Sequence, residues 1–248
     1  MGTPLDDLKL KRTRPDLNFG QRMHILSSHP NQSQPPPRKF PENCVKRGEA
    51  MNMWKTRGSI FGTPVVLHSG FRSEFCFFQR HPNLECVIGV CESGELITEF
   101  FSRGSAHSLV QSGSLPPALT LRLVLGVCAG LEFLRAKGFP GRGRGLSSKD
   151  ILVSANWEAR LSQRLLISHP ADSNESRGDC SGVLRVLSEL LPTPLQSSHN
   201  SLAADLFNLL TIFSSKPDFD GLFRELRLLS KRDLQVTDEA VQAFVLGL

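Results

Sequence analysis

Residues 81–100 read HPNLECVIGVCESGELITEF. Two runs in this stretch, Cys86–Cys91 and Glu95–Phe100, are rich in Val, Ile, Phe and Thr and are separated by Ser93 and Gly94. Runs of β-branched and aromatic residues between such breaks are typical of β-strands. We therefore expect a strand at each run, and a further strand upstream over Pro64–His68.

After Pro117 the pattern becomes helical. Apolar residues recur there every three or four positions as far as Leu134, which is the repeat of one helix face, and Gly138 closes the pattern. Short strands are expected at Ile151–Ser154 and Arg160–Leu166, and helices at Val183–Leu191, Leu202–Phe213, Phe219–Leu229 and Asp238–Leu248. Strands followed by helices predict an α+β fold of two lobes, a reduced β-rich N-terminal lobe and a mainly helical C-terminal lobe.

Residues 1–50 differ in composition from the remainder. They are rich in Pro, Ser, Asn, Gln and basic residues, and they include the run Pro35-Pro36-Pro37-Arg38-Lys39. Such a stretch buries too little apolar surface to offset the entropy of ordering. We therefore expect a disordered basic tail over residues 1–50 and one folded domain over residues 51–248. The tail could attract an acidic partner, but aromatic side chains that stack on bases are scarce in it, so no specific nucleic-acid binding is expected.

The bulk composition indicates the cellular compartment in which the chain is expected and whether it is expected to span a membrane. Hydrophobic residues make up 40% of the chain and charged residues 21%, and the net charge is +5. No run approaches the roughly 18 apolar residues that a membrane span needs, so no transmembrane segment is expected. The six cysteines are scattered, without the spacing of a zinc site. Scattered free thiols suit a reducing compartment, and we expect a cytoplasmic protein without a metal site.

The order of several short motifs resembles that of protein kinase domains. His81-Pro82-Asn83-Leu84, followed by Val87-Ile88-Gly89-Val90-Cys91, is similar to the H-P-N-L…L-G-V-C segment of kinases of the tyrosine-kinase-like type. Leu96–Phe100 resembles the strand that runs into the kinase hinge, and Pro117–Leu134 resembles the long helix after it. The resemblance implies a gatekeeper at Thr98 and a hinge contact for nucleotide at Thr98 and Glu99.

The same resemblance fixes where the catalytic groups of a kinase would stand. Residues 143–153 lie at the place of the H-R-D-L-x-x-x-N-I-L-V loop, which puts Gly145 at the catalytic aspartate and Asp150 at the metal-binding asparagine. Gln163 stands at the aspartate of D-F-G. Phosphoryl transfer needs carboxylates at these positions to orient the acceptor hydroxyl and to hold magnesium. A glycine and a neutral amide supply neither.

The N-terminal lobe departs from the kinase pattern as well. Val65-Val66-Leu67-His68 resembles V-A-I-K, with His68 in place of the lysine that binds phosphates. Gly58 and Gly62 are a weak match to the glycine-rich loop, because their spacing differs from G-x-G-x-x-G. The chain contains no tyrosine, so it cannot be regulated by phosphorylation of one.

These substitutions predict a chain that is not an enzyme. The resemblance then implies a pseudokinase, a signalling scaffold or regulatory module that binds protein partners through its helical lobe, with neither ATP nor magnesium as a cofactor. Two alternatives stay open at this point. One is an ATP-binding kinase with an atypical site around Asp150, and the other is a shortened kinase-domain product that serves as a helical interaction module.

Overall fold

The computed structural model describes residues 38–52, 55–70, 80–113, 115–139, 142–163, 165, 175–191 and 201–232. All of these belong to one compact unit of the chain, Gln34–Leu248. The expected disorder of residues 1–37 and the expected helix Asp238–Leu248 lie outside the described residues.

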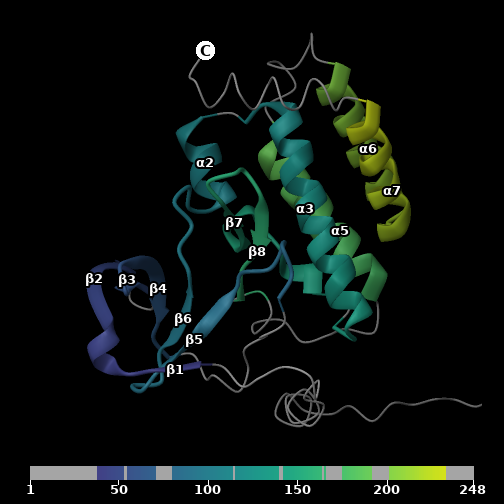
Figure 1. Ribbon diagram of the computed structural model, residues 1–248. Coiled ribbons are helices and arrows are strands. Elements are labelled where there is room, and N and C mark those ends of the chain that lie inside the picture. Colours follow the sequence, from purple (N-terminus) through teal and green to yellow (C-terminus); the bar gives the residue numbers. More distant parts are fainter. Residues whose placement is uncertain are drawn as a thin grey trace, which may run out of the picture. The chain divides into compact units, whose positions relative to one another are not determined.

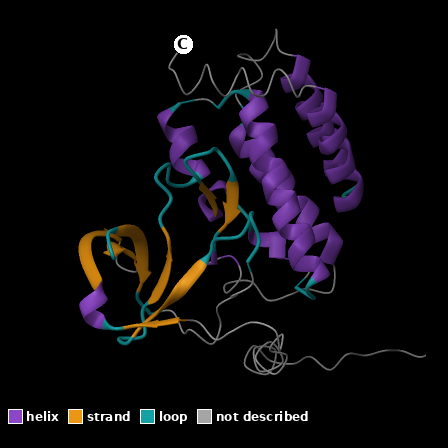
Figure 2. Ribbon diagram, viewed as in Figure 1, coloured by secondary structure: helices purple, strands orange, loops and turns teal. Residues whose placement is uncertain are grey.

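A six-stranded sheet forms the N-terminal part of this unit (Figures 1 and 2). Its strands are β1 (Arg38–Phe40), β2 (Val45–Asn52), β3 (Lys55–Ile60), β4 (Thr63–His68), β5 (Val87–Cys91) and β6 (Leu96–Glu99), and a 3-10 turn η1 (Glu42–Cys44) precedes β2. The strand order is β1-β5-β6-β4-β3-β2. β1 pairs with β5 in parallel and all other pairs are antiparallel. β2 is therefore an edge strand, and β4 and β6 lie in the interior of the sheet.

A two-residue turn joins β3 to β4. Ile60 pairs with Thr63, and the φ angles of Phe61 and Gly62 between them are 50° and 83°. A positive φ at both central positions is the requirement of the type I′ turn, whose twist matches that of the flanking strands. Gly62 adopts this conformation without a steric penalty. The turn fixes the register of β4, which places His68 at the far end of that strand.

The C-terminal part is mainly helical (Figure 2). Its elements are α2 (Ala106–Ser112), α3 (Pro117–Ala136), η3 (Arg142–Gly145), η4 (Ser148–Asp150), β7 (Ile151–Val153), β8 (Ala159–Leu161), α5 (Glu175–Leu190), α6 (Ser201–Ser215) and α7 (Phe219–Arg232). The central helix α3 has Pro117 at its first turn, where proline costs no hydrogen bond. It ends just before Gly138, whose φ is 81°.

Two apolar cores support these two parts. The larger core surrounds α3 and joins it to β7, β8, α5, α6 and α7. The smaller one lies in the sheet and consists of Val45, Ile60, Val65, Leu67, Cys91 and Ile97. Trp157, in the turn between β7 and β8, belongs to the larger core, and the Arg103 guanidinium lies 3.8 Å from the centre of its ring.

Only α3 among the described helices has the length and apolar composition that a membrane span would need. A buried core helix of a globular domain meets the same criteria, and Leu121, Leu131 and Leu134 of α3 are at most 1% exposed. α3 is accordingly the centre of the larger core, and it gives no firm indication of a transmembrane segment.

The expected α+β architecture, with a β-rich N-terminal region and a helical C-terminal region, is confirmed. The strands expected at Pro64–His68, Cys86–Cys91 and Glu95–Phe100 correspond to β4, β5 and β6, and the helix after Pro117 corresponds to α3. The sheet, however, begins earlier than expected. β1 and most of β2 lie before residue 51, so residues 38–40 and 45–50 belong to the sheet, although they were expected in the disordered tail.

Candidate functional site

Four polar side chains are buried together where the sheet meets the helical part. His68, Glu85, Thr98 and Gln163 are each at most 2% exposed. They come from the end of β4, from the segment before β5, from β6 and from the residue pair after β8. His68 pairs with Leu96 and Val66 pairs with Thr98, so His68 and Thr98 are diagonal neighbours on one face of the sheet. We call these four residues the junction cluster.

Glu85 is the centre of the junction cluster. Its Oε1 lies 3.6 Å from His68 Nε2, and that same nitrogen lies 2.9 Å from the Thr98 hydroxyl. Gln163 contacts Glu85 twice, because its backbone N–H donates to Oε2 at 2.7 Å and its side-chain amide donates to the Glu85 carbonyl at 2.9 Å. One buried carboxylate thus connects β4 of the sheet with the segment that follows β8.

The charge of Glu85 is maintained by its neighbours. Burial alone raises the pKa of this carboxyl group, and it is the largest single effect. The hydrogen bond and charge of His68, the Gln163 N–H and the charge of Lys55 together outweigh it, so that the net pKa is lowered. Glu85 is therefore ionised at neutral pH, and its partners are what make a buried charge tolerable here.

Glu99 forms a second connection beside the cluster. Its Oε1 accepts hydrogen bonds from the backbone N–H of Cys86 and from Arg160 Nη1, both at 2.9 Å. Arg160 belongs to β8, so this ion pair again links the sheet to the C-terminal part. Burial is the main cause of the raised pKa of Glu99. The carboxylate expected at a nucleotide hinge is thus engaged with Cys86 and Arg160.

The segment that contains Gly145 and Asp150 forms two short 3-10 turns, η3 and η4. Asp150 Oδ2 accepts hydrogen bonds from the Ser147 N–H at 3.1 Å and from the Ser147 hydroxyl at 2.9 Å, which makes a capping box around η4. The Asp150 carbonyl accepts from the N–H of Ser162, the neighbour of Gln163. Asp150 is therefore hydrogen-bonded to the residue that precedes Gln163 of the junction cluster, and its carboxylate caps η4.

Helix α5 fixes the position of η3. The buried Asp179 accepts a hydrogen bond from the Gly143 N–H at 2.7 Å. One turn further along α5, Gly182 lies so close to Gly143 that a Cβ atom on it would overlap the Gly143 carbonyl oxygen. A backbone hydrogen bond to a buried carboxylate and a contact between two glycines thus position the loop that ends at Gly145.

The kinase-like architecture implies ATP and magnesium, and the described side chains can be compared with that demand. His68, which the resemblance puts at the place of the phosphate-binding lysine, is engaged with Thr98 and Glu85. Asp150 is engaged with Ser147, and Gln163 offers an amide that already donates to Glu85. This set does not fit a nucleotide with its metal ion. The polar groups at these positions are already bonded to other groups of the protein, those of His68 and Gln163 within the junction cluster and that of Asp150 to Ser147.

The two glycines expected at a phosphate loop are separated from the junction cluster. Gly58 lies within β3, where a Cβ atom would stand 2.9 Å from the Lys46 carbonyl oxygen, and Gly62 lies in the turn between β3 and β4. Both are explained by close strand packing or by a positive φ. The structure thus brings together His68, Thr98 and Gln163, with Asp150 and Glu99 beside them, and leaves Gly58 and Gly62 apart.

Two important residues were not singled out from the sequence. Glu85 stands between Leu84 and the apolar run that begins at Val87, where a carboxylate is unexpected in a buried stretch. That mismatch is the signal that could have identified it, because a buried charge requires partners. Arg160 offered no such signal, since an arginine within a short strand commonly faces solvent.

No family model matches the chain. It is similar to several protein kinases along parts of its length. An EPD1-interacting receptor-like cytoplasmic serine/threonine-protein kinase of Nicotiana benthamiana is 24% identical over 57% of the chain and 32% of the relative. The probable serine/threonine-protein kinase PBL15 of Arabidopsis thaliana is 35% identical over 38% of the chain and 24% of the relative. Activin receptor type-1-like of Mus musculus is 27% identical over 53% of the chain and 31% of the relative.

These similarities support a protein-kinase-like fold. Each match spans less than a third of these three relatives, so the chain resembles a fragment of a kinase. They also correct one expectation. The prediction that the chain is not an enzyme is contradicted, because relatives are named serine/threonine-protein kinases. That prediction treated the residues at three positions, His68, Gly145 and Gln163, as decisive. The similarity, however, is to proteins that are named for serine/threonine-kinase activity.

Proposed function

We propose that this chain acts in serine/threonine-kinase signalling as a protein-binding, regulatory kinase-like domain. The observation that supports this function best is the junction cluster. The resemblance puts His68, Thr98 and Gln163 where a kinase contacts its nucleotide, and here their bonds run to Glu85 and to one another. These bonds connect the sheet with the helical part, which suits a domain that presents a fixed surface to a partner. The assignment to the tyrosine-kinase-like type, supported by the H-P-N-L segment, is part of this proposal.

The helical part offers a surface for such a partner. A hollow of about 320 Å³ lies between α5 and α6. It is lined by Ser181, Leu184, Arg185, Ser188, Leu210, Ser214 and Pro217. Apolar side chains beside hydroxyl groups and one arginine are typical of a protein interface, in which an apolar centre has a polar rim. We propose that the partner is the kinase domain of a serine/threonine kinase like the relatives named above.

A binding measurement tests this proposal. A purified kinase domain of the Arabidopsis thaliana relative is titrated into the full chain in a calorimeter, and we expect saturable binding. Arg185→Glu should weaken it, because the substitution places a negative charge at the rim of the hollow. Arg224→Glu is the matched control, since Arg224 is exposed on α7. Absence of binding, or equal weakening by both variants, would contradict the proposal.

We also propose that the chain takes neither ATP nor magnesium as a cofactor, and that it works in the cytoplasm. The absence of a cofactor is supported by the side chains of the junction cluster and of Asp150, which are a poor fit for ATP and magnesium. The second point is supported by the name of one relative, a receptor-like cytoplasmic kinase. A thermal-unfolding series tests the first point, since a ligand that binds the native state raises Tm. We expect an unchanged Tm with ATP and MgCl2.

Phosphoryl transfer to serine or threonine is the second candidate function, which the names of the relatives favour. It predicts a rise in Tm with ATP and MgCl2 and incorporation of labelled phosphate into a serine/threonine substrate. Both should disappear in Asp150→Ala, because the kinase resemblance puts Asp150 at the metal-binding asparagine. These results would replace the first proposal, whereas an unchanged Tm without phosphate transfer would remove the second.

A further inference from the structure

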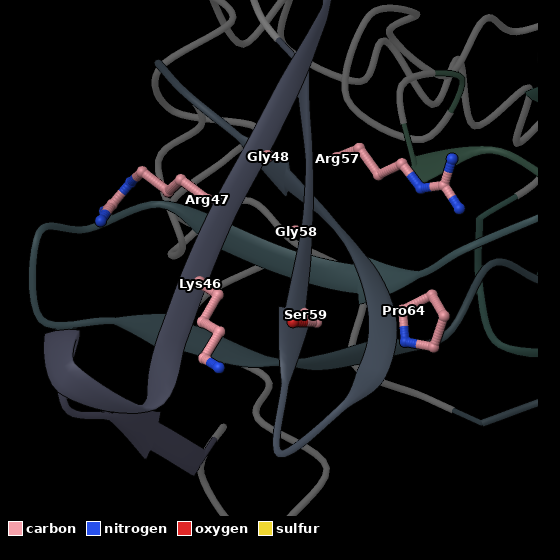
Figure 3. A pocket seen from close by; sticks show the side chains of 7 residues that line it. All are labelled: Lys46, Arg47, Gly48, Arg57, Gly58, Ser59 and Pro64. Atoms are coloured by element: carbon pink, nitrogen blue, oxygen red, sulfur yellow. The ribbon is translucent and has the colours of Figure 1, made fainter.

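A second hollow lies on the sheet, between the edge strand β2 and β3 (Figure 3). Its volume is about 280 Å³. It is lined by Lys46, Arg47, Gly48, Arg57, Gly58, Ser59 and Pro64, and we call it the sheet groove. None of its residues belongs to the junction cluster. Pro64 and His68 are four residues apart on β4, which corresponds to about 13 Å along a strand.

The sheet groove carries positive charge on one face. Lys46 pairs with Ser59, and Arg57 lies two residues from Ser59 on the same strand, so the three side chains leave the same face of the sheet. Among the described residues, no carboxylate forms a salt bridge with Lys46 or Arg57. Arg47, by contrast, is neutralised by Glu42 at 2.8 Å and by Glu95 at 2.5 Å.

Glycines form the floor of the groove. A Cβ atom on Gly48 would stand 3.0 Å from the Arg57 carbonyl oxygen, and one on Gly58 would stand 2.9 Å from the Lys46 carbonyl oxygen. These positions therefore require glycine for strand packing, and they leave bare backbone between the two cations. The Arg57 guanidinium lies 4.6 Å from the centre of the Phe100 ring, which restrains its position.

Among the described strands, β2 lies at the edge of the sheet. It pairs with β3 and with no other described strand, and its residues from Lys46 to Met51 are exposed. An edge strand offers a row of backbone N–H and C=O groups to an extended segment that lies beside it. A ligand that extends along β2 would therefore have its alternate side chains next to Lys46 and Arg57.

These observations indicate an anionic group on an extended polypeptide. A cation with a hydroxyl beside it, Lys46 with Ser59, suits the oxygens of a phosphate monoester, while the Arg57 guanidinium points away from Lys46 (Figure 3) and would meet a neighbouring residue of the same segment. A free nucleotide is a poorer match, because no aromatic side chain lines the groove to stack on a base. We propose that the sheet groove binds a phosphorylated serine or threonine in an extended segment of a protein partner. This site is separate from the hollow between α5 and α6.

The test uses the full chain and fluorescence polarisation. The probe is a labelled oriented peptide library with a fixed phosphoserine, compared with the same library carrying serine. We expect binding of the phosphorylated library only, weakened about tenfold or more by Lys46→Glu and by Arg57→Glu. Arg224→Glu on α7 makes the same change in net charge and should leave the affinity unchanged. Unchanged melting curves of all three variants would show that the fold is retained.

Several outcomes would overturn the inference. Equal binding of both libraries would mean that phosphate is not recognised, and equal weakening by Arg224→Glu would mean that only net charge matters. Vesicles with phosphatidylserine form a separate arm, because a membrane surface is also anionic. Vesicle binding that is lost in Lys46→Glu, without phosphopeptide binding, would assign the groove to lipid. The sheet groove and the hollow between α5 and α6 have no lining residue in common, and Arg185→Glu should not affect peptide binding. If no phosphopeptide binds the sheet groove, the interaction proposed for the hollow between α5 and α6 is therefore unaffected.

Discussion

Glu85 shows how one carboxylate can join two parts of a domain. It is 1% exposed, so its charge depends entirely on His68, on the Gln163 N–H and on the more distant Lys55. If the carboxylate is removed, these partners stay buried, because the backbone around them is fixed by β4 and by the segment after β8. The Gln163 N–H would lose its carboxylate acceptor, and the cost of losing that acceptor at a buried donor exceeds the net value of one hydrogen bond.

Glu85→Ala should destabilise the fold by about 1–3 kcal/mol or more, because the buried Gln163 N–H loses its charged acceptor and His68 loses its carboxylate neighbour. The free energy of unfolding from urea titration measures this. Glu158→Ala is the control, since Glu158 is half exposed and lies 3.7 Å from Arg160, and exposed pairs contribute about 0–1 kcal/mol. Equal losses in both variants would show that the junction cluster does not stabilise the fold.

The stability that Glu85 contributes should depend on pH. Its pKa is lowered below the ordinary value of 4.5, so the folded state favours the ionised form. This contribution is fully present above the pKa of the unfolded chain and is lost as the pH falls through the lower pKa of the folded state. The difference in unfolding free energy between the natural chain and Glu85→Gln should therefore be larger at neutral pH than at about pH 3. A difference that stays constant over this range would contradict the ionised assignment.

At the scale of elements, the contact of α5 with η3 determines the course of the loop around Gly145. α5 approaches the loop through two small features, the Asp179 carboxylate and the bare backbone of Gly182. No side chain fits between Gly182 and Gly143. The loop and the helix are therefore packed backbone to backbone, and neither can shift without moving the other.

Gly182→Ala should destabilise the chain by about 3 kcal/mol or more, because the added methyl overlaps a backbone carbonyl that cannot rotate away. Thermal unfolding measures the effect. Gly113→Ala is the matched control at the end of α2, where a Cβ atom would meet nothing within 4 Å. A Gly182→Ala variant with an unchanged Tm would mean that α5 and η3 are not in close contact in solution.

The sequence predicted elements well where burial leaves a periodic pattern, as in α3, β4, β5 and β6. It did not predict β2, whose residues after Val45 are all exposed and show no alternation. It did not predict α2 either, a seven-residue helix whose N-cap is Ser105. For the site, the kinase resemblance named His68, Thr98, Glu99, Asp150 and Gln163 as important positions. It could not give their partners, because Glu85 and Arg160 join them through contacts between distant parts of the chain.

At the scale of the whole described unit, the two cores differ in size and in their protection of cysteines. Cys128 and Cys180 belong to the larger core around α3, and Cys91 belongs to the sheet core. Burial raises the pKa of all three thiols, to about 11 for Cys180. Since the thiolate is the reactive form, buried and protonated thiols react slowly. Cys44 and Cys86 are partly exposed.

Of the five described cysteines, Cys44 and Cys86 should react first with a thiol reagent such as DTNB at neutral pH. Cys91, Cys128 and Cys180 should react only after urea unfolds the chain. Cys86 should be slower than Cys44, because burial also raises the pKa of Cys86. Peptide mapping by mass spectrometry after alkylation assigns the order. Early modification of Cys128 would contradict the packing of α3 in the larger core.

The placement of Trp157 provides an optical probe. The chain has two tryptophans and no tyrosine, so its near-ultraviolet emission comes from these two indoles alone. Trp157 is 4% exposed in the larger core, against the Arg103 guanidinium. With Trp54→Phe, the emission of a single indole would follow the opening of the helical part. Its red shift could then be recorded while a phosphopeptide occupies the other end of the domain, without attaching any dye.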